Sequence, residues 1–147
     1  MIDPRETPDL LHQFQLSQSS SMRPNLWLFE AEPGVRNVVI FIGGELGWSV
    51  TELDSATEAW LQLREARREG GETGWPDFVI ADLLADRECR QWLLAVREAC
   101  PQIRMVCYSM LPLGETLKGE LAQAHIEFRD KPQSLREVFA LFQSCSR

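Results

Sequence analysis

The chain has 147 residues, of which 44% are hydrophobic and 25% are charged, and its net charge is -7. This length and composition are typical of one soluble globular domain with a real hydrophobic core. The acidic balance and scattered basic residues argue against a nucleic-acid-binding surface, and no apolar stretch is long enough to span a membrane.

Residues 1–24 are predicted to form a flexible tail, and residues 25–147 the folded domain. The tail contains Pro4, Pro8 and Pro24 and a polar run at 15–21, which favour a mobile segment. A partner-docking peptide is the alternative interpretation of this segment.

Five short apolar segments predict β-strands at 26–29, 48–53, 78–81, 103–108 and 126–128. Each is followed by a segment with helical spacing of its apolar residues, at 33–46, 55–69, 86–99, 114–124 and 134–144. Strands and helices that alternate in this way predict a parallel sheet with helices on both faces, a doubly wound α/β fold.

Two helices have apolar faces that predict buried side chains. The helix that begins at Pro33 is expected to bury Val35, Val38, Val39, Ile42 and Leu46. The last helix, capped by Ser134, is expected to bury Leu135, Val138, Phe139 and Phe142.

The four cysteines, Cys89, Cys100, Cys107 and Cys145, have no Cys-x-x-Cys spacing, and no histidine completes a metal-ligand pattern with them. We therefore expect a reducing cytoplasmic environment and no structural metal. Cys107 lies in an apolar strand and is expected in the core.

Four of the predicted strands end near reactive or charged side chains, which are Glu30, Asp82, Ser109 and Lys131. In an open parallel sheet, ligands bind beyond the carboxyl ends of the strands. This set suits phosphoryl transfer to a carboxylate: Asp82 as nucleophile, a second acid helping to hold Mg²⁺, and Lys131 with Ser109 binding phosphoryl oxygens.

Each of these residues also has a structural interpretation. Asp82 is equally suited to cap the next helix, and Glu30 could be an acid that interacts favourably with the dipole of the helix that follows it. Ser109 could be a turn residue and Lys131 a surface lysine. No glycine-rich phosphate loop follows any predicted strand, which disfavours a nucleotide-binding or flavin-binding enzyme.

In these features the sequence resembles the receiver domain of bacterial two-component response regulators. The likeness covers residues 25 to about 144 and rests on motifs in the family's order: 26–33 (LWLFEAEP), 76–84 (PDFVIADLL), 106–109 (VCYS) and 128–132 (FRDKP). It implies a flavodoxin-like (β/α)5 fold with strand order 2-1-3-4-5, and a stand-alone signalling protein rather than an enzyme.

The same resemblance implies roles for individual residues. Asp82 would be the phosphoacceptor, Lys131 the family's conserved lysine, and Ser109 and Phe128 the switch pair. The metal would be held by Glu30 and Asp82, with the backbone of Leu84 as a further ligand.

Several positions depart from the family pattern. Ala31 stands where the second acid usually binds the metal, which should weaken Mg²⁺ binding, since affinity follows the charge of the ligands. Glu32 is expected to point away from the site, and Met110, which replaces a small residue, is expected to cover it. Asp86 replaces a proline and is either a ligand or a helix cap, of which we favour the cap.

Two functions are consistent with these observations. The first is a single-domain receiver that takes a phosphoryl group onto Asp82 from a histidine kinase or phosphotransfer protein. It would signal to a downstream protein, as a monomer or a homodimer, without nucleic acid or membrane. The second is a degenerate receiver that docks proteins independently of phosphorylation, which Ala31 and Met110 favour.

Overall fold

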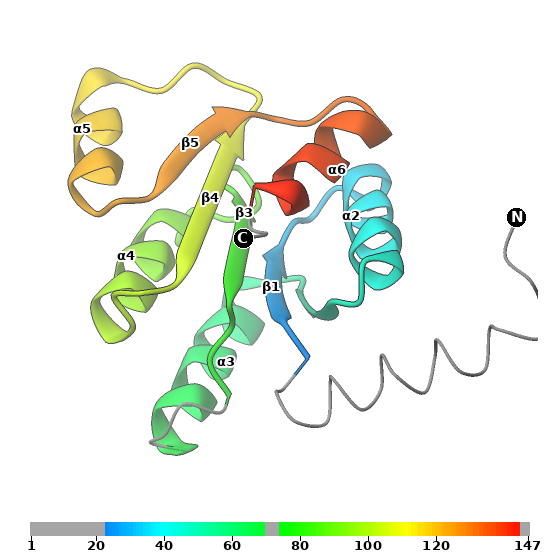
Figure 1. The fold of residues 1–147 in the computed structure, drawn as a ribbon. Helices are drawn as coiled ribbons and strands as arrows, with labels where there is room; N and C mark the ends of the chain where they lie inside the picture. Colours follow the sequence, from blue (N-terminus) through cyan, green and yellow to red (C-terminus); the bar gives the residue numbers. More distant parts are fainter. Residues whose placement is uncertain (1–22, 70–73, 145–147) are drawn as a thin grey trace, which may run out of the picture.

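The central element of the fold is a five-stranded parallel sheet in the order β2-β1-β3-β4-β5 (Figure 1). The computed structural model describes residues 23–69 and 74–144. The strands are β1 (Asn25–Phe29), β2 (Ser49–Leu53), β3 (Phe78–Asp82), β4 (Arg104–Ser109) and β5 (Glu127–Asp130). The helices are α2 (Pro33–Glu45), α3 (Ala56–Glu69), α4 (Cys89–Ala99), α5 (Glu115–Gln123) and α6 (Leu135–Gln143). This order confirms the predicted flavodoxin-like (β/α)5 fold.

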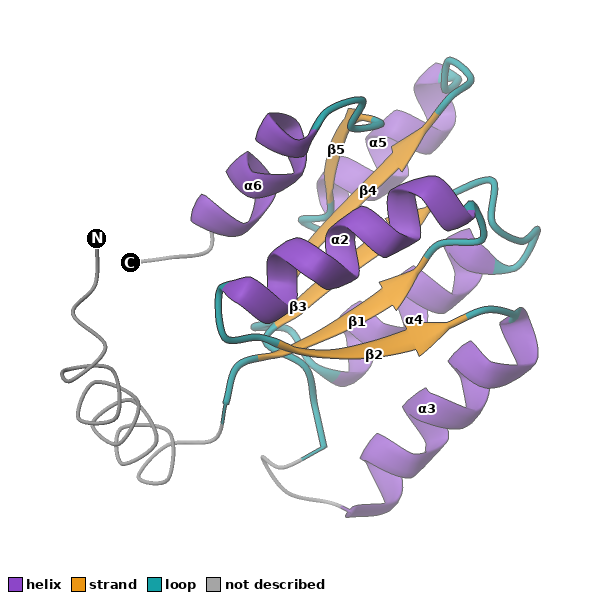
Figure 2. Ribbon diagram, turned by 90° about the vertical axis from the view of Figure 1, so that its right-hand side faces the viewer, coloured by secondary structure: helices purple, strands orange, loops and turns teal. Residues whose placement is uncertain are grey.

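Helices cover both faces of the sheet. α2 and α6 pack on one face, and α3, α4 and α5 pack on the other (Figure 2). Alternate side chains of the central strands point to opposite faces: Leu28 and Ile80 join the core on the first side, and Trp27 and Val79 join the core on the second. Because both faces are covered, β1 and β3 are apolar at nearly every position.

Aromatic rings join the helices to the central strands. The Trp92 ring of α4 lies 5.5 Å from Phe29 and 6.1 Å from Trp27 of β1. The Phe142 ring of α6 lies 6.0 Å from Phe78 of β3. Such ring pairs add about 0.5–1.5 kcal/mol each beyond the burial of their area. They therefore hold α4 and α6 against opposite faces of the sheet.

For the α2 face, the prediction of a buried side chain is wrong at one residue, Leu46. It is 40% exposed, although the apolar spacing placed it inside. The helix ends at Glu45, and Gly47, with φ 88°, turns the chain toward β2. Leu46 therefore lies beyond the part of the helix that packs on the sheet.

The predicted face of α6 is also partly wrong. Leu135 and Phe139 are 58% and 38% exposed, while Leu141, which was not assigned to that face, is buried. The residues that meet the sheet are Val138, Leu141 and Phe142, in an i, i+3, i+4 pattern. The helix is therefore rotated about its axis relative to the prediction.

Most element boundaries lie within one residue of the prediction, and the two larger differences have local reasons. α4 begins at Cys89 rather than at residue 86, because turns occupy the segment after β3 and the Asp86 carboxylate accepts the Glu88 N–H at 2.8 Å. β5 reaches Asp130, because its ladder with β4 continues to the pair of Ser109 and Asp130.

The predicted tail falls almost entirely outside the described residues, as does Cys145. Cys107 is fully buried, as predicted. No helix in residues 23–69 and 74–144 is long and apolar enough to cross a membrane.

Candidate functional site

Asp82 lies at the carboxyl edge of the sheet, as the last residue of β3, and is 4% exposed. Its Oδ1 accepts a hydrogen bond from the Leu84 N–H at 2.9 Å. Its Oδ2 accepts one from Lys131 Nζ at 2.7 Å. Because each oxygen has its own donor, the carboxylate is held in a defined orientation.

Lys131 is the cation on which three carboxylates converge. It follows β5 directly and is almost fully buried. Its Nζ lies 2.7 Å from Oδ2 of Asp82, 2.7 Å from Oε2 of Glu32 and 3.6 Å from Oε2 of Glu30. Burial acts to lower the pKa of Lys131, but the hydrogen bonds to Asp82 and Glu32 outweigh it and raise that pKa above its ordinary value. The ammonium therefore stays charged at neutral pH.

Glu30 follows the last residue of β1 and is fully buried. Tyr108 donates its hydroxyl to Oε1 at 2.5 Å, and the Glu32 N–H donates to Oε2 at 2.9 Å. Burial raises the pKa of Glu30 and the charge of Asp82 adds to the rise, although both hydrogen bonds oppose it. Burial also raises the pKa of Tyr108, so its hydroxyl keeps its proton and remains a donor.

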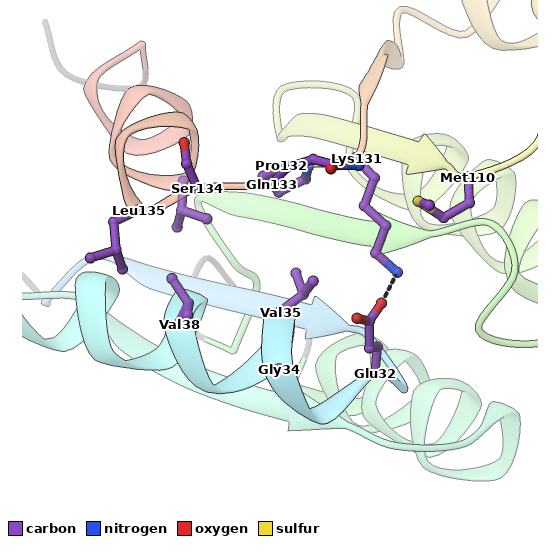
Figure 3. A pocket seen from close by; sticks show the side chains of 11 residues that line it. Glu32, Gly34, Val35, Val38, Met110, Lys131, Pro132, Gln133, Ser134 and Leu135 are labelled. Carbon is purple, nitrogen blue, oxygen red and sulfur yellow. Dashed lines mark ion pairs between the residues drawn. The ribbon is translucent and has the colours of Figure 1, made fainter.

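The expectation that Glu32 points away from the site is wrong. Its side chain turns toward Lys131 and forms an ion pair (Figure 3). Glu32 directly precedes Pro33, the first residue of α2, and its carboxylate makes no capping hydrogen bond, which leaves it available to Lys131. A carboxylate thus reaches the site from position 32, although Ala31 offers none.

The other predicted residues lie around this cluster. Ser109 ends β4 and is nearly buried, and its Oγ accepts the Leu111 N–H at 3.1 Å. Phe128 is half-buried against the core on the α3, α4 and α5 side. Met110 is 59% exposed and lines the same cavity as Lys131 (Figure 3), and whether it covers the site stays a prediction.

A cavity of about 480 Å³ opens beside Lys131, between the start of α2 and the start of α6 (Figure 3). Its apolar wall includes Val35 and Val38 from α2 and Leu135 from α6, and the ion pair of Lys131 with Glu32 lies at one end. This cavity explains the exposed side chain of Leu135, which lines it instead of packing on the sheet.

In this structure the carboxylates of the site are paired with donors of the protein itself. In the described ranges, 23–69 and 74–144, no three acid, histidine or cysteine side chains are grouped closely enough to hold a metal ion. Mg²⁺ prefers several free oxygen ligands. Here the Glu30 and Asp82 oxygens accept protein hydrogen bonds, and Lys131 lies where the carboxylates meet. The Mg²⁺ site at Glu30, Asp82 and the Leu84 backbone stays a prediction.

Tyr108 is the residue of the site that the sequence did not reveal. It is the only tyrosine of the chain and directly precedes Ser109. Its ring lies 5.7 Å from Lys131 Nζ, and its register partner in β3 is Asp82. A hydroxyl-bearing ring in an otherwise apolar strand was the available signal, but it looked like an ordinary core aromatic.

Comparison with solved structures finds the same fold in response regulators. A response regulator from Thermotoga maritima has 17% identity and a TM-score of 0.65, over 84% of this chain and 98% of that one. A CheY-like receiver domain protein from Methanospirillum hungatei has 11% identity and a TM-score of 0.67, over 83% and 92%. The phosphorylated cyanobacterial phytochrome response regulator RcpA has 16% identity and a TM-score of 0.64, over 83% and 90%.

No protein-family model matches the sequence, and no curated protein matches it. At these identities the structural comparison establishes the fold, which is that of response regulator receiver domains.

Proposed function

We propose that this chain is a receiver module that accepts a phosphoryl group on Asp82 and passes the signal on through protein contacts. The observation that carries the proposal is the pairing of Asp82 with Lys131 at the carboxyl edge of the sheet, with 2.7 Å between Oδ2 and Nζ. A carboxylate of defined orientation beside a fixed ammonium is suited to receive a phosphoryl group, because the cation offsets the charge that arrives.

The reaction that we propose is a direct displacement at phosphorus. An oxygen of Asp82 forms a bond to phosphorus while the bond from phosphorus to the donor breaks. With acetyl phosphate as donor, the leaving group is acetate. The Lys131 ammonium then pairs with the phosphoryl oxygens, and residue 82 carries a phosphoryl group with about 1.5 to 2 negative charges in place of the single charge of its carboxylate.

The signal would leave the site through Ser109 and Phe128. The Ser109 hydroxyl, now bonded to the Leu111 N–H, would turn to the phosphoryl oxygens, and half-buried Phe128 would move into the space that opens. This movement would repack the surface formed by α5, β5 and α6. The donor would be a histidine kinase or phosphotransfer protein, and the recipient a downstream protein or a second copy of the chain.

A second candidate is a module that docks proteins without phosphorylation. It is favoured by Ala31, which offers no carboxylate at its position, and by the hydrogen bonds that already occupy Glu30 and Asp82. On this account the ion cluster would be a permanent structural feature of the edge.

Intact mass spectrometry after incubation with acetyl phosphate separates the two candidates. The first predicts one phosphoryl adduct on the wild type and none on Asp82→Asn, which keeps the size of the side chain. The second predicts no adduct on either protein. The incubation is made with and without Mg²⁺, since the proposal specifies the acceptor and not the metal.

A further inference from the structure

Tyr108 connects two strands across the candidate site. Its hydroxyl, on β4, reaches Oε1 of Glu30 at the end of β1, with 2.5 Å between the oxygens. Both side chains are 0% exposed, so water does not compete for this bond. Lys131 Nζ lies above the same ring at 5.7 Å. Tyr108 is therefore part of the ion cluster as well as of the core.

The bond matters because it uses the innermost acid of the site. Oε1 of Glu30 accepts from Tyr108, and Oε2 accepts from the Glu32 N–H. A divalent ion that bound Glu30 would have to displace these two donors or share the carboxylate oxygens with them. Both donors are held in place, one by the packing of its ring and the other by the backbone. The remaining acids, Asp82 and Glu32, share Lys131 between them.

We propose that Tyr108 withholds Glu30 from divalent cations, so that Lys131 serves as the resident cation of this site. The inference deepens the proposed function, because it concerns the regulation of the same site, but it does not require phosphorylation to occur. Two features then lower the affinity of the site for a divalent ion: the absence of a carboxylate at Ala31 and the hydroxyl of Tyr108. Each can be changed separately.

The contrasting explanation is that the Tyr108 hydroxyl only satisfies a buried carboxylate. Burial without a partner is costly for Glu30, so a donor is needed for stability in either case. The two explanations differ in the affinity for a divalent ion. If the hydroxyl competes with the ion, its removal must tighten binding; if it does not, affinity must stay the same.

The test is a titration of the full chain with Mn²⁺, with free Mn²⁺ measured by electron paramagnetic resonance. We expect Tyr108→Phe to bind Mn²⁺ roughly tenfold more tightly than the wild type, the factor typical of one hydrogen bond to a charged group. Ala31→Asp, which adds an acid, is the positive control and should also bind more tightly. Unchanged affinity in Tyr108→Phe, with a gain in Ala31→Asp, would overturn the proposal.

Glu30→Gln keeps the proposal testable should Tyr108→Phe fail to fold. A withheld Glu30 contributes only long-range charge, so this variant should lower the wild-type affinity for Mn²⁺ by no more than about twofold. A loss of about tenfold or more would show that Glu30 already serves as a ligand and would overturn the proposal. In the double variant with Tyr108→Phe, Glu30→Gln should remove the gain. Failure of Asp82 phosphorylation would leave all of these results unaffected.

Discussion

Lys131 and Asp82 form a buried ion pair between the end of β5 and the end of β3, with 2.7 Å between Nζ and Oδ2 and each side chain 6% exposed. Two residues that are 49 positions apart in the sequence thus meet at one edge of the sheet. The pair joins the candidate phosphoacceptor to the segment that leads into α6.

The first prediction concerns the strength of this pair. Lys131→Met should lower the free energy of unfolding by about 3 kcal/mol, because it leaves the Asp82 carboxylate buried without its cation. The measurement is urea unfolding at pH 7. The double variant with Asp82→Asn should be more stable than the sum of the single effects by about 1–3 kcal/mol. Additive effects would contradict a direct coupling between the two side chains.

The second prediction concerns the alkaline range. The pKa of Tyr108 is raised in the folded state, so its contribution to stability is full below the ordinary tyrosine pKa of about 10 and falls as pH rises above it. Relative to Tyr108→Phe, the wild type should lose about 1.4 kcal/mol of stability per pH unit above about pH 10. The measurement is urea unfolding of both proteins at several pH values. A constant difference between them would contradict a raised pKa for Tyr108.

Since Tyr108 is the only tyrosine, tyrosinate absorbance gives a second reading of the same property. Absorbance of the folded protein should rise only as the chain unfolds. A smooth titration near the ordinary tyrosine pKa in folded protein would show that the hydroxyl is not held by Glu30.

The third prediction compares two neighbouring glycines of α2. A Cβ added at Gly43 would lie 3.1 Å from Cζ of Phe142 and 3.2 Å from Cγ2 of Val50, whereas a Cβ at Gly44 would meet nothing within 4 Å. Gly43→Ala should therefore destabilise the fold by about 1–3 kcal/mol. Gly44→Ala should stabilise it by about 0.5–1 kcal/mol, because alanine has a higher helix propensity than glycine. Equal effects in thermal unfolding would contradict the close packing of α2 on α6.

The fourth prediction concerns Arg97, whose guanidinium donates hydrogen bonds to the carbonyls of Ala124, Pro101 and His125 at 2.8, 2.8 and 3.0 Å. Lysine cannot reproduce this planar set of donors, so Arg97→Lys should lower the free energy of unfolding by about 2 kcal/mol. Arg90→Lys is the matched control on the same helix, because among the described residues Arg90 pairs with Glu120 in an exposed ion pair at 3.6 Å, and its substitution should change stability by less than about 0.5 kcal/mol. A similar small effect at both positions would show that the Arg97 contacts contribute little.

The sheet and the position of the site were predictable because each strand carries its own signal. The run from Phe78 to Asp82 is apolar until its last residue, and parallel topology brings the ends of such strands to one edge. Glu30, Asp82 and Lys131 meet there for that reason. The orientation of Glu32 was not predictable, since it depends on a side-chain torsion that only the position of Lys131 decides.

The bond from Tyr108 to Glu30 was likewise hidden from the sequence. It joins residues 78 positions apart, and its partner could be any polar group near the end of a strand. The exposed side chains of Leu135 and Phe139 show the same limit, because apolar spacing gives a helical face but not the angle at which the helix meets the sheet.

Locating the modification shows whether Asp82 accepts the phosphoryl group. The chain is incubated with acetyl phosphate, reduced with borohydride, which converts an acyl phosphate to an alcohol, and digested for peptide mass spectrometry. We expect the reduced residue to be Asp82 and no reduced peptide from Asp82→Asn. Reduction at another carboxylate, or none at all, would contradict this expectation.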